Sequence, residues 1–119
     1  MKIDQADKYF SLYVRNRDKW TCQRCKGNFQ TGGLQASHYF GRRMESVRYD
    51  LENVDSLCYG CHRYWEKEDR EAYREFKVKQ LGEKGFQALN IRARLIAKKD
   101  RKMMAIVWRK ACRDAGYIE

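Results

Sequence analysis

Two Cys-x-x-Cys pairs, Cys22/Cys25 and Cys58/Cys61, constrain the fold of this chain more than any other feature. Each pair is typical of a tight turn that directs two thiolates toward one point, and two such turns supply the four sulfur ligands of a closed tetrahedral zinc site. One ion bound by all four would connect the beginning of the central segment to its end. A structural zinc site contributes on the order of 10 kcal/mol or more to folding. We therefore predict one structural zinc ion.

The hydropathy of the chain bears on the redox state of its cysteines. The first ten residues, MKIDQADKYF, lack the apolar stretch of a secretion signal, and no apolar run approaches the roughly 20 residues that span a bilayer. We expect an intracellular protein with no signal peptide and no membrane segment, in which thiols stay reduced. Five cysteines, an odd number, then favour metal ligation over a disulfide framework. The distant Cys112 is expected to be a small buried hydrophobe.

The chain is strongly basic. Its 119 residues include 26 Lys+Arg against 16 Asp+Glu, which gives a formal net charge of +10. Such a charge favours a polyanionic partner, and nucleic acid is the first candidate. A basic surface that serves only solubility is the alternative that charge alone leaves open.

The sequence divides into three segments of what we predict to be a single domain of the α+β class. Apolar residues follow the helical period at both ends of the chain but not in the centre, where glycines separate short strand-like stretches at 34–39 and 53–57. No proline or linker-like tract interrupts the chain. The predicted parts of the domain, residues 1–119, are an N-terminal helix (1–19), a zinc-stapled core (20–66) and a basic helical cap (67–119).

Capping residues and apolar spacing predict the helices in more detail. Asp4 is the predicted N-cap of a helix that reaches about Arg17. Gly82 and Gly116 are placed to end helices in the C-terminal part. The predicted helices there cover about 68–81, 84–98 and 100–115. We expect their apolar stripes to be buried in the core; the stripes contain Tyr73, Phe76, Leu81, Phe86, Leu89, Ala93, Ile96, Met104, Val107, Trp108 and Ala111.

The two histidines of the chain, His38 and His62, stand near the cysteine pairs together with Asn53. The surrounding stretches read Cys-Gln-Arg-Cys, Leu-Gln-Ala-Ser-His-Tyr-Phe-Gly-Arg-Arg and Arg-Tyr-Asp-Leu-Glu-Asn-Val-Asp-Ser-Leu-Cys-Tyr-Gly-Cys-His. In order and spacing, residues 22–65 resemble the HNH (ββα-metal) endonucleases, most of all the zinc-stapled phage recombination nucleases of the NinG/Rap kind. The resemblance implies a ββα-metal core and metal-dependent hydrolysis of DNA, including branched or recombination-related DNA in a phage-infected cell.

The resemblance also implies a role for each of these side chains. Hydrolysis of a phosphodiester requires a base for the water nucleophile and a cation for the leaving oxygen. His38 would be the base, because a neutral imidazole with an ordinary pKa of about 6.5 accepts a proton near neutral pH. By resemblance, Asn53 would orient the His38 ring through a hydrogen bond. His62 would bind a catalytic divalent cation, Mg²⁺ or Mn²⁺, distinct from the zinc ion.

One position departs from the family pattern. Many members carry Asp or His directly before the base, as a second ligand of the catalytic cation, whereas this chain has Ser37. Either Ser37 coordinates through its hydroxyl or a water molecule, or a carboxylate such as Asp50, Asp55 or Glu66 takes its place, or the site is weak. The sequence leaves these alternatives open.

Basic residues near His38 and toward the C-terminus are candidates for contact with the DNA backbone. Guanidinium groups match phosphate geometry with two parallel hydrogen bonds, so arginines in the loop after His38 are the first choice. Farther along, a basic cluster would follow the backbone by releasing counterions, and a solvated helix face is the alternative. The candidates are Arg42, Arg43 and Arg48 near the base, and Lys98, Lys99, Arg101 and Lys102 in the C-terminal part.

Two other classes of function remain open at this point. A zinc-stabilised nucleic-acid-binding module with weak or no catalysis has the same charge and cysteines, and Ser37 favours it. An interaction domain with purely architectural cysteines is the third reading. His62 also has an alternative role, as a zinc ligand in place of one cysteine. Cleavage of both DNA strands would favour a dimer, but the sequence contains no interface signal that decides the oligomeric state.

Overall fold

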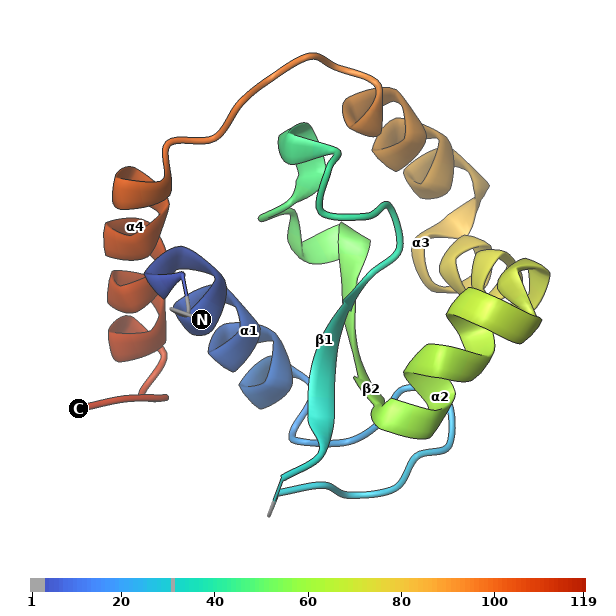
Figure 1. The fold of residues 1–119 in the computed structure, drawn as a ribbon, viewed down its shortest axis with the longest axis horizontal. Coiled ribbons are helices and arrows are strands. Elements are labelled where there is room, and N and C mark those ends of the chain that lie inside the picture. The colour runs from blue at the N-terminus through green and yellow to red at the C-terminus, as the bar shows by residue number, and fades with distance from the viewer. Residues whose placement is uncertain (1–3, 31) are drawn as a thin grey trace.

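The computed structural model describes residues 4–30 and 32–119 and has an α+β architecture (Figure 1). Helices surround a small sheet of two antiparallel strands. The elements are α1 (Gln5–Arg17), β1 (Leu34–His38), the 3-10 turns η1 (Glu45–Val47) and η2 (Leu51–Asn53), β2 (Val54–Cys58), α2 (Tyr59–Arg63), the π-helical turn η3 (Tyr64–Glu68), α3 (Arg70–Ala93) and α4 (Arg101–Asp114).

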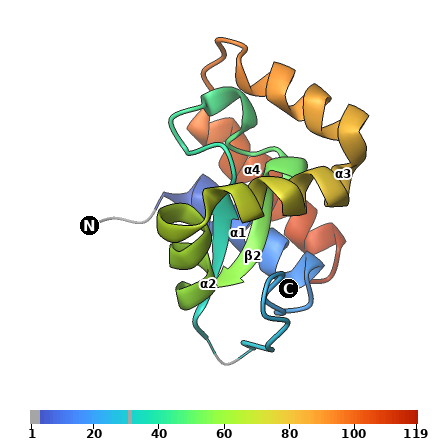
Figure 2. The ribbon, with the colours of Figure 1, turned by 90° about the vertical axis from the view of Figure 1, so that its right-hand side faces the viewer.

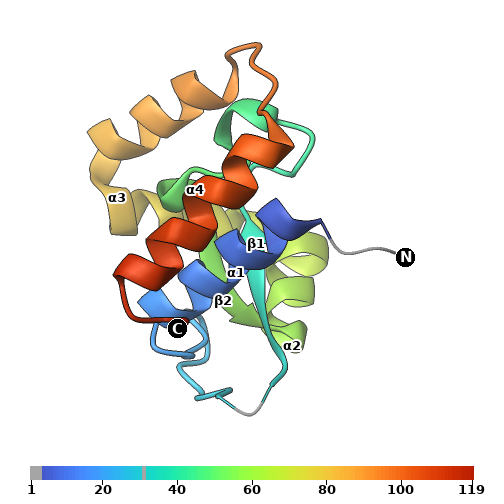
Figure 3. The same cartoon turned by 90° about the vertical axis from the view of Figure 1, so that its left-hand side faces the viewer.

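The sheet separates the molecule into two sides. β1 and β2 pair with Leu34 opposite Cys58 and His38 opposite Val54. Helices α2 and α3 cover one face of the sheet (Figure 2), whereas α1 covers the opposite face, with α4 outside it (Figure 3). Because side chains alternate along a strand, neighbouring residues of β1 enter different halves of the core.

Helix α1 begins where its capping residue predicts. The Asp4 carboxylate accepts hydrogen bonds from the backbone N–H groups of Ala6 (2.8 Å) and Asp7 (3.2 Å). Phe10 and Val14 of its apolar stripe are buried against the sheet. The predicted N-terminal helix is thus confirmed in its start, its end and its buried face.

Helix α4 is held mainly by α1. Trp108 packs edge-on against Phe10 and Tyr13, with ring centroids 4.7 and 5.3 Å away. Cys112 is fully buried, and its Sγ donates a weak hydrogen bond to the Tyr9 carbonyl at 3.3 Å. Burial also raises the pKa of this thiol. Cys112 is therefore the buried small side chain that the sequence predicts.

Helix α3 consists of two helical pieces that meet at Gly82. This residue has φ +77° and ψ 163°, a conformation that favours glycine, so the predicted break is confirmed. The second piece ends at Ala93 and not near 98, and Ile96 is fully exposed instead of buried. Residues 94–100 form the connection to α4, whose N-cap is Asp100 (Figure 1). No helix within the described residues has both the length and the apolar character needed to cross a membrane.

A buried ion pair joins α3 to the sheet. The Lys77 ammonium lies 3.0 Å from a carboxylate oxygen of Asp55, and both side chains are almost completely buried. Lys77 also donates to the Glu52 carbonyl and to the Gln80 side chain, so its three hydrogens have partners. Burial lowers the Lys77 pKa, and the Asp55 charge opposes that shift. The pair connects α3 to β2.

Replacing Lys77 with methionine should destabilise the protein by about 3–5 kcal/mol, because the Asp55 carboxylate is left buried without its cation. The measurement is the free energy of unfolding in urea, with Lys79→Met as the matched control on the exposed side of the same helix. Equal losses for the two variants would show that the buried pair has no special role.

Candidate metal centre and candidate catalytic site

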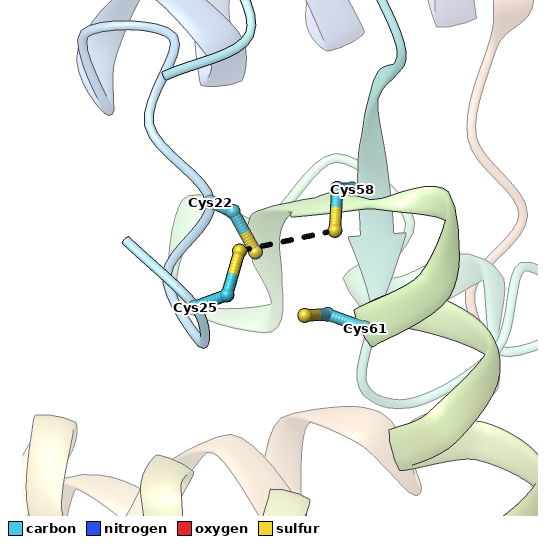
Figure 4. A group of neighbouring side chains, drawn as sticks. All are labelled: Cys22, Cys25, Cys58 and Cys61. Atoms are coloured by element: carbon cyan, nitrogen blue, oxygen red, sulfur yellow. Dashed lines mark hydrogen bonds between the residues drawn. The ribbon is translucent and has the colours of Figure 1, made fainter. Parts of the chain in front are cut away.

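The four paired cysteines converge on one point. Cys22 and Cys25 come from the loop after α1, Cys58 ends β2 and Cys61 lies in α2 (Figure 4). All four sulfur atoms lie within 4.8 Å of one another, and those of Cys25 and Cys58 are 4.0 Å apart. Four sulfur ligands in this arrangement can hold one structural metal ion such as zinc.

Backbone hydrogen bonds shape the first cysteine turn, which we call the first knuckle (residues 22–25). The Lys26 N–H donates to the Cys22 carbonyl at 2.9 Å, and Lys26 adopts a left-handed conformation with φ 64°. The Gln23 N–H donates to the Ser56 carbonyl at 2.9 Å, which fastens the knuckle to β2. The first pair of sulfur ligands is therefore positioned by β2, the strand that ends in Cys58.

The thiols of this cluster have different proton affinities. Burial opposes ionisation of Cys22, but backbone N–H groups, led by that of Cys58, lower its pKa to about 7. Burial and the neighbouring thiols raise the pKa of Cys61 to about 12, although Arg24 Nη1 lies 3.4 Å from its sulfur. Four adjacent thiolates repel one another unless a cation lies between them. The donor set thus fits a divalent metal ion, which compensates the thiolate charge.

His62 is placed outside the cysteine cluster. Its Nδ1 lies 2.7 Å from Gln35 Oε1, and its Nε2 lies 2.9 Å from Glu66 Oε1. The first contact reaches β1, and the second reaches the next turn of the chain, η3. The alternative in which His62 replaces a cysteine ligand is not supported, because the four cysteines complete the set by themselves.

His62 lines an open pocket of about 460 Å³ between β1 and α2. Glu66 is the carboxylate beside His62, and one nitrogen and one carboxylate oxygen at this position could bind a hard divalent cation. The pocket is lined by Gln35, Tyr59, His62, Arg63, Glu66 and Lys67.

Three other predicted candidates for the catalytic cation do not reach this pocket. The hydroxyl of Ser37 is completely buried and bonds to the Tyr73 hydroxyl at 2.9 Å. Asp50 caps η2 and forms an ion pair with Arg92 at 2.8 Å. It precedes the first residue of β2, whereas His62 follows the last one. Asp55 forms the buried ion pair with Lys77. The prediction of Ser37 and Asp50 as ligands is therefore wrong, since each side chain is committed to a structural contact.

His38 lies at the end of β1 with a fixed ring orientation. Its Nε2 is 2.9 Å from the Arg48 carbonyl, and its ring packs against Phe10 with centroids 6.1 Å apart. A carbonyl oxygen only accepts, so Nε2 carries the hydrogen and Nδ1 keeps its lone pair. Burial, followed by the charges of Arg42 and Arg48, lowers the pKa of His38 to about 4 despite the bond to the carbonyl. The imidazole is therefore neutral at physiological pH.

Asn53 does not bind the imidazole. Its side-chain oxygen accepts from the Phe40 N–H at 2.8 Å, and its amide nitrogen donates to the carbonyls of Phe40 (3.0 Å) and Val47 (3.1 Å). The predicted contact between Asn53 and His38 is thus wrong. Asn53 instead fixes the loop between the strands, and this loop contains Arg48, whose carbonyl contacts His38.

The structure does not bring His38 and His62 together in one pocket. Gln35, which contacts His62, and His38 are three positions apart on β1, so their side chains point to opposite faces. His38 packs against α1, whereas His62 lies on the side of α2 and α3. The resemblance implied a single site, and strand alternation explains why the two rings diverge.

The predicted DNA contacts divide into two groups. Arg48 pairs with Asp7 at 2.5 Å and Glu45 at 3.4 Å, and Arg101 pairs with Glu45 at 2.5 Å. Arg101 also donates to the Tyr49 hydroxyl, so Arg48 and Arg101 both have contacts within the chain that compete with a phosphate. The other predicted contacts, exposed or partly exposed, are Arg42, Arg43, Lys98, Lys99 and Lys102.

Two groups of contact residues have no clear signal in the sequence. Gln35 was part of a predicted strand, but its pairing with His62 depends on how α2 packs on β1. Asp7 and Glu45 are ordinary surface-type residues whose partners lie far away in the chain. Glu66 is one of several candidate carboxylates in the sequence. It lies four residues after His62, and this helical spacing is the signal that distinguishes it from the others.

Comparisons with known proteins add no relative: no family model, no curated protein and no solved structure matches this chain. The class that the fold and the site define is an α+β protein with a four-cysteine cluster that could hold one structural metal ion.

Replacing Cys58 with serine should abolish the uptake of about one zinc ion per chain and unfold the central segment, because a three-sulfur site loses much of the binding free energy that supports folding. Metal content by mass spectrometry and thermal unfolding measure the effect. Cys112→Ser is the matched control, since Cys112 lies outside the cluster and should leave the metal content unchanged.

The low pKa of His38 should make stability depend on pH. Between pH of about 6.5 and about 4 the unfolded chain binds a proton at His38 but the folded chain does not, so the free energy of unfolding decreases as the pH falls. The expected loss is on the order of 3 kcal/mol. Urea unfolding at several pH values should show a smaller slope for His38→Gln than for wild type, and an unchanged slope would contradict the low pKa.

Proposed function

We propose that this protein is a metal-dependent endonuclease that hydrolyses DNA phosphodiester bonds, with zinc as its structural ion. The observation that supports the proposal best is the state of His38. The Arg48 carbonyl holds the hydrogen of the neutral imidazole on Nε2, so Nδ1 carries the lone pair that a general base needs, although burial lowers the His38 pKa to about 4 and so weakens it as a base. The exposed Arg42 lies close enough to affect the His38 pKa, so a guanidinium is available near the base for a phosphate oxygen.

Zinc is the proposed occupant of the cysteine cluster because four thiolates select a soft or borderline ion with tetrahedral geometry. The site has no open position, so its role is structural. The catalytic cation is a second ion, Mg²⁺ or Mn²⁺, which stabilises charge on the leaving oxygen when bound. Its proposed protein ligands are His62 and Glu66, and Glu66 here replaces the ligand expected at Ser37.

The proposed residues act from the two sides of β1. Within the described residues β1 pairs only with β2, while the first knuckle bonds to β2 through Ser56, so β1 forms an outer edge of the sheet. Hydrolysis needs the base and the cation at one phosphate, so the proposal requires the scissile phosphate to lie across this edge, within reach of both the His38 side and the His62 side. His38 would take the proton from water, Arg42 and Arg43 would bind phosphate, and Asn53 would hold the loop that positions them.

The charge of the chain supports a nucleic-acid partner of the proposed enzyme. Arg42, Arg43, Lys98 and Lys102 are exposed, and the formal net charge is +10. Such a surface binds the phosphate backbone with little sequence preference. Branched or recombination-related DNA, an intracellular location and a dimer that cuts both strands extend the proposal on the strength of the resemblance alone.

A second candidate function has its own support. Because His38 and His62 face opposite sides of the sheet and Ser37 is buried, the chain also fits a zinc-stabilised DNA-binding module without catalysis. Such a module would use the same basic residues. Cleavage in the presence of added cation separates the two candidates.

The test is cleavage of plasmid and branched DNA with Mg²⁺ or Mn²⁺. His38→Ala should reduce cleavage at least 100-fold, the lower end of what a general base contributes, while DNA affinity stays unchanged. Lys79→Ala is a control remote from the His38 loop. A His38→Ala protein that cuts at the wild-type rate would exclude His38 as the base, and wild-type binding without any cleavage would favour the second candidate.

A further inference from the structure

Tyr59 is a solvent-exposed aromatic residue that lines the candidate cation pocket. It is the first residue of α2 and lies between the metal-ligating Cys58 and Cys61. Its exposed fraction is 62%, although the neighbouring Trp65 is buried. The cysteines on both sides point toward one another across the four-sulfur cluster, and the Tyr59 ring lies at the surface beside it.

The pocket beside Tyr59 is open and large enough for a small ligand. Its volume of about 460 Å³ lies within the roughly 300–1,000 Å³ of small-molecule sites. Tyr59 contributes an aromatic wall and Gln35 an amide. The Gln35 oxygen is bonded to His62, and its amide nitrogen is available to a hydrogen-bond acceptor of a ligand.

Two cations lie along the same pocket. Arg63 and Lys67 are both exposed, and neither forms an ion pair with any part of the chain within residues 4–30 and 32–119. Many other basic side chains of this protein are committed to carboxylates, as Arg48 and Arg92 are. An aromatic wall with adjacent cations matches a nucleotide, whose base has a π face and whose phosphates are anionic.

We propose that this pocket binds one unpaired nucleobase of DNA, stacked on the Tyr59 ring, with the flanking phosphates on Arg63 and Lys67. Paired bases within a duplex expose only their edges, so an aromatic wall can stack only on a base that has left the helix. The inference rests on the proposed action on DNA and deepens it, because it names the substrate class: duplexes that contain unpaired nucleotides, such as bulges, gaps and branch points.

The test is a set of binding measurements that do not depend on cleavage. A fluorescently labelled duplex carries either one unpaired 2-aminopurine or an abasic residue at the same position, and affinities are measured by anisotropy without added Mg²⁺ or Mn²⁺. The wild-type protein should bind the base-containing duplex about 5- to 150-fold more tightly than the abasic duplex, the range that stacking on an aromatic ring contributes. It should also quench the 2-aminopurine fluorescence.

Variants of Tyr59 isolate the stacking contribution. Tyr59→Ala should lose the preference for the base and the quenching, while its affinity for the abasic duplex stays within twofold of wild type. Tyr59→Phe should keep both, because the ring remains. Arg63→Gln should weaken binding of both duplexes to a similar degree, since phosphates are present in each.

The results that would overturn this inference can be told apart from the results that would reject the nuclease proposal. A wild-type protein without preference for the base, or a Tyr59→Ala variant that loses affinity equally for both duplexes, would show that Tyr59 is not a stacking platform. Absence of DNA binding at low salt would remove both proposals. Base preference without any cleavage would leave the pocket assignment standing and reject the nuclease.

Discussion

The convergence of four cysteine sulfurs is the constraint on which the rest of the structure depends. It joins the loop after α1 to the end of β2 and the beginning of α2, and a hydrogen bond from Gln23 to Ser56 completes the connection. The direction of α2 sets the position of His62 and Glu66 against Gln35. Because four adjacent thiols ionise together only around a cation, a metal ion bound here would couple its binding to the folding of the central segment.

Much of the positive charge of this chain has a structural use. Lys77 compensates Asp55 inside the core, and Arg17 donates to the carbonyls of Leu51 and Val54 at the start of β2. Other arginines pair with carboxylates that lie far away in sequence, as Arg101 does with Glu45. The total of 26 Lys+Arg therefore overstates the number of cations available to a polyanion. The exposed basic residues of the 42–43 loop and of the pocket beside His62 carry the argument for DNA.

The placement of β1 between two layers connects the fold to the proposed chemistry. Its alternating side chains send His38 toward α1 and Gln35 toward α2, so a base and a candidate cation site lie on opposite faces of an edge strand. This arrangement supports a nuclease only if DNA follows the edge and meets both sides. It equally suits a binding module in which His38 is a buried structural histidine, and the neutral, hydrogen-bonded state of its ring is common to both interpretations.

The sequence by itself determined the features that arise from local chemistry: the N-cap at Asp4, the break at Gly82 and the two cysteine turns that form the four-sulfur cluster. It also predicted two strands and the α+β class, and it overestimated the helix that was expected to bury Ile96. Only the tertiary structure decided which cation pairs with which carboxylate, that Asn53 holds a loop and not a ring, and that the two imidazoles face apart. The physical reason is range. Capping, backbone strain and ligand spacing act over a few residues, whereas ion pairs and side-chain facing depend on the packing of segments that are distant in the chain.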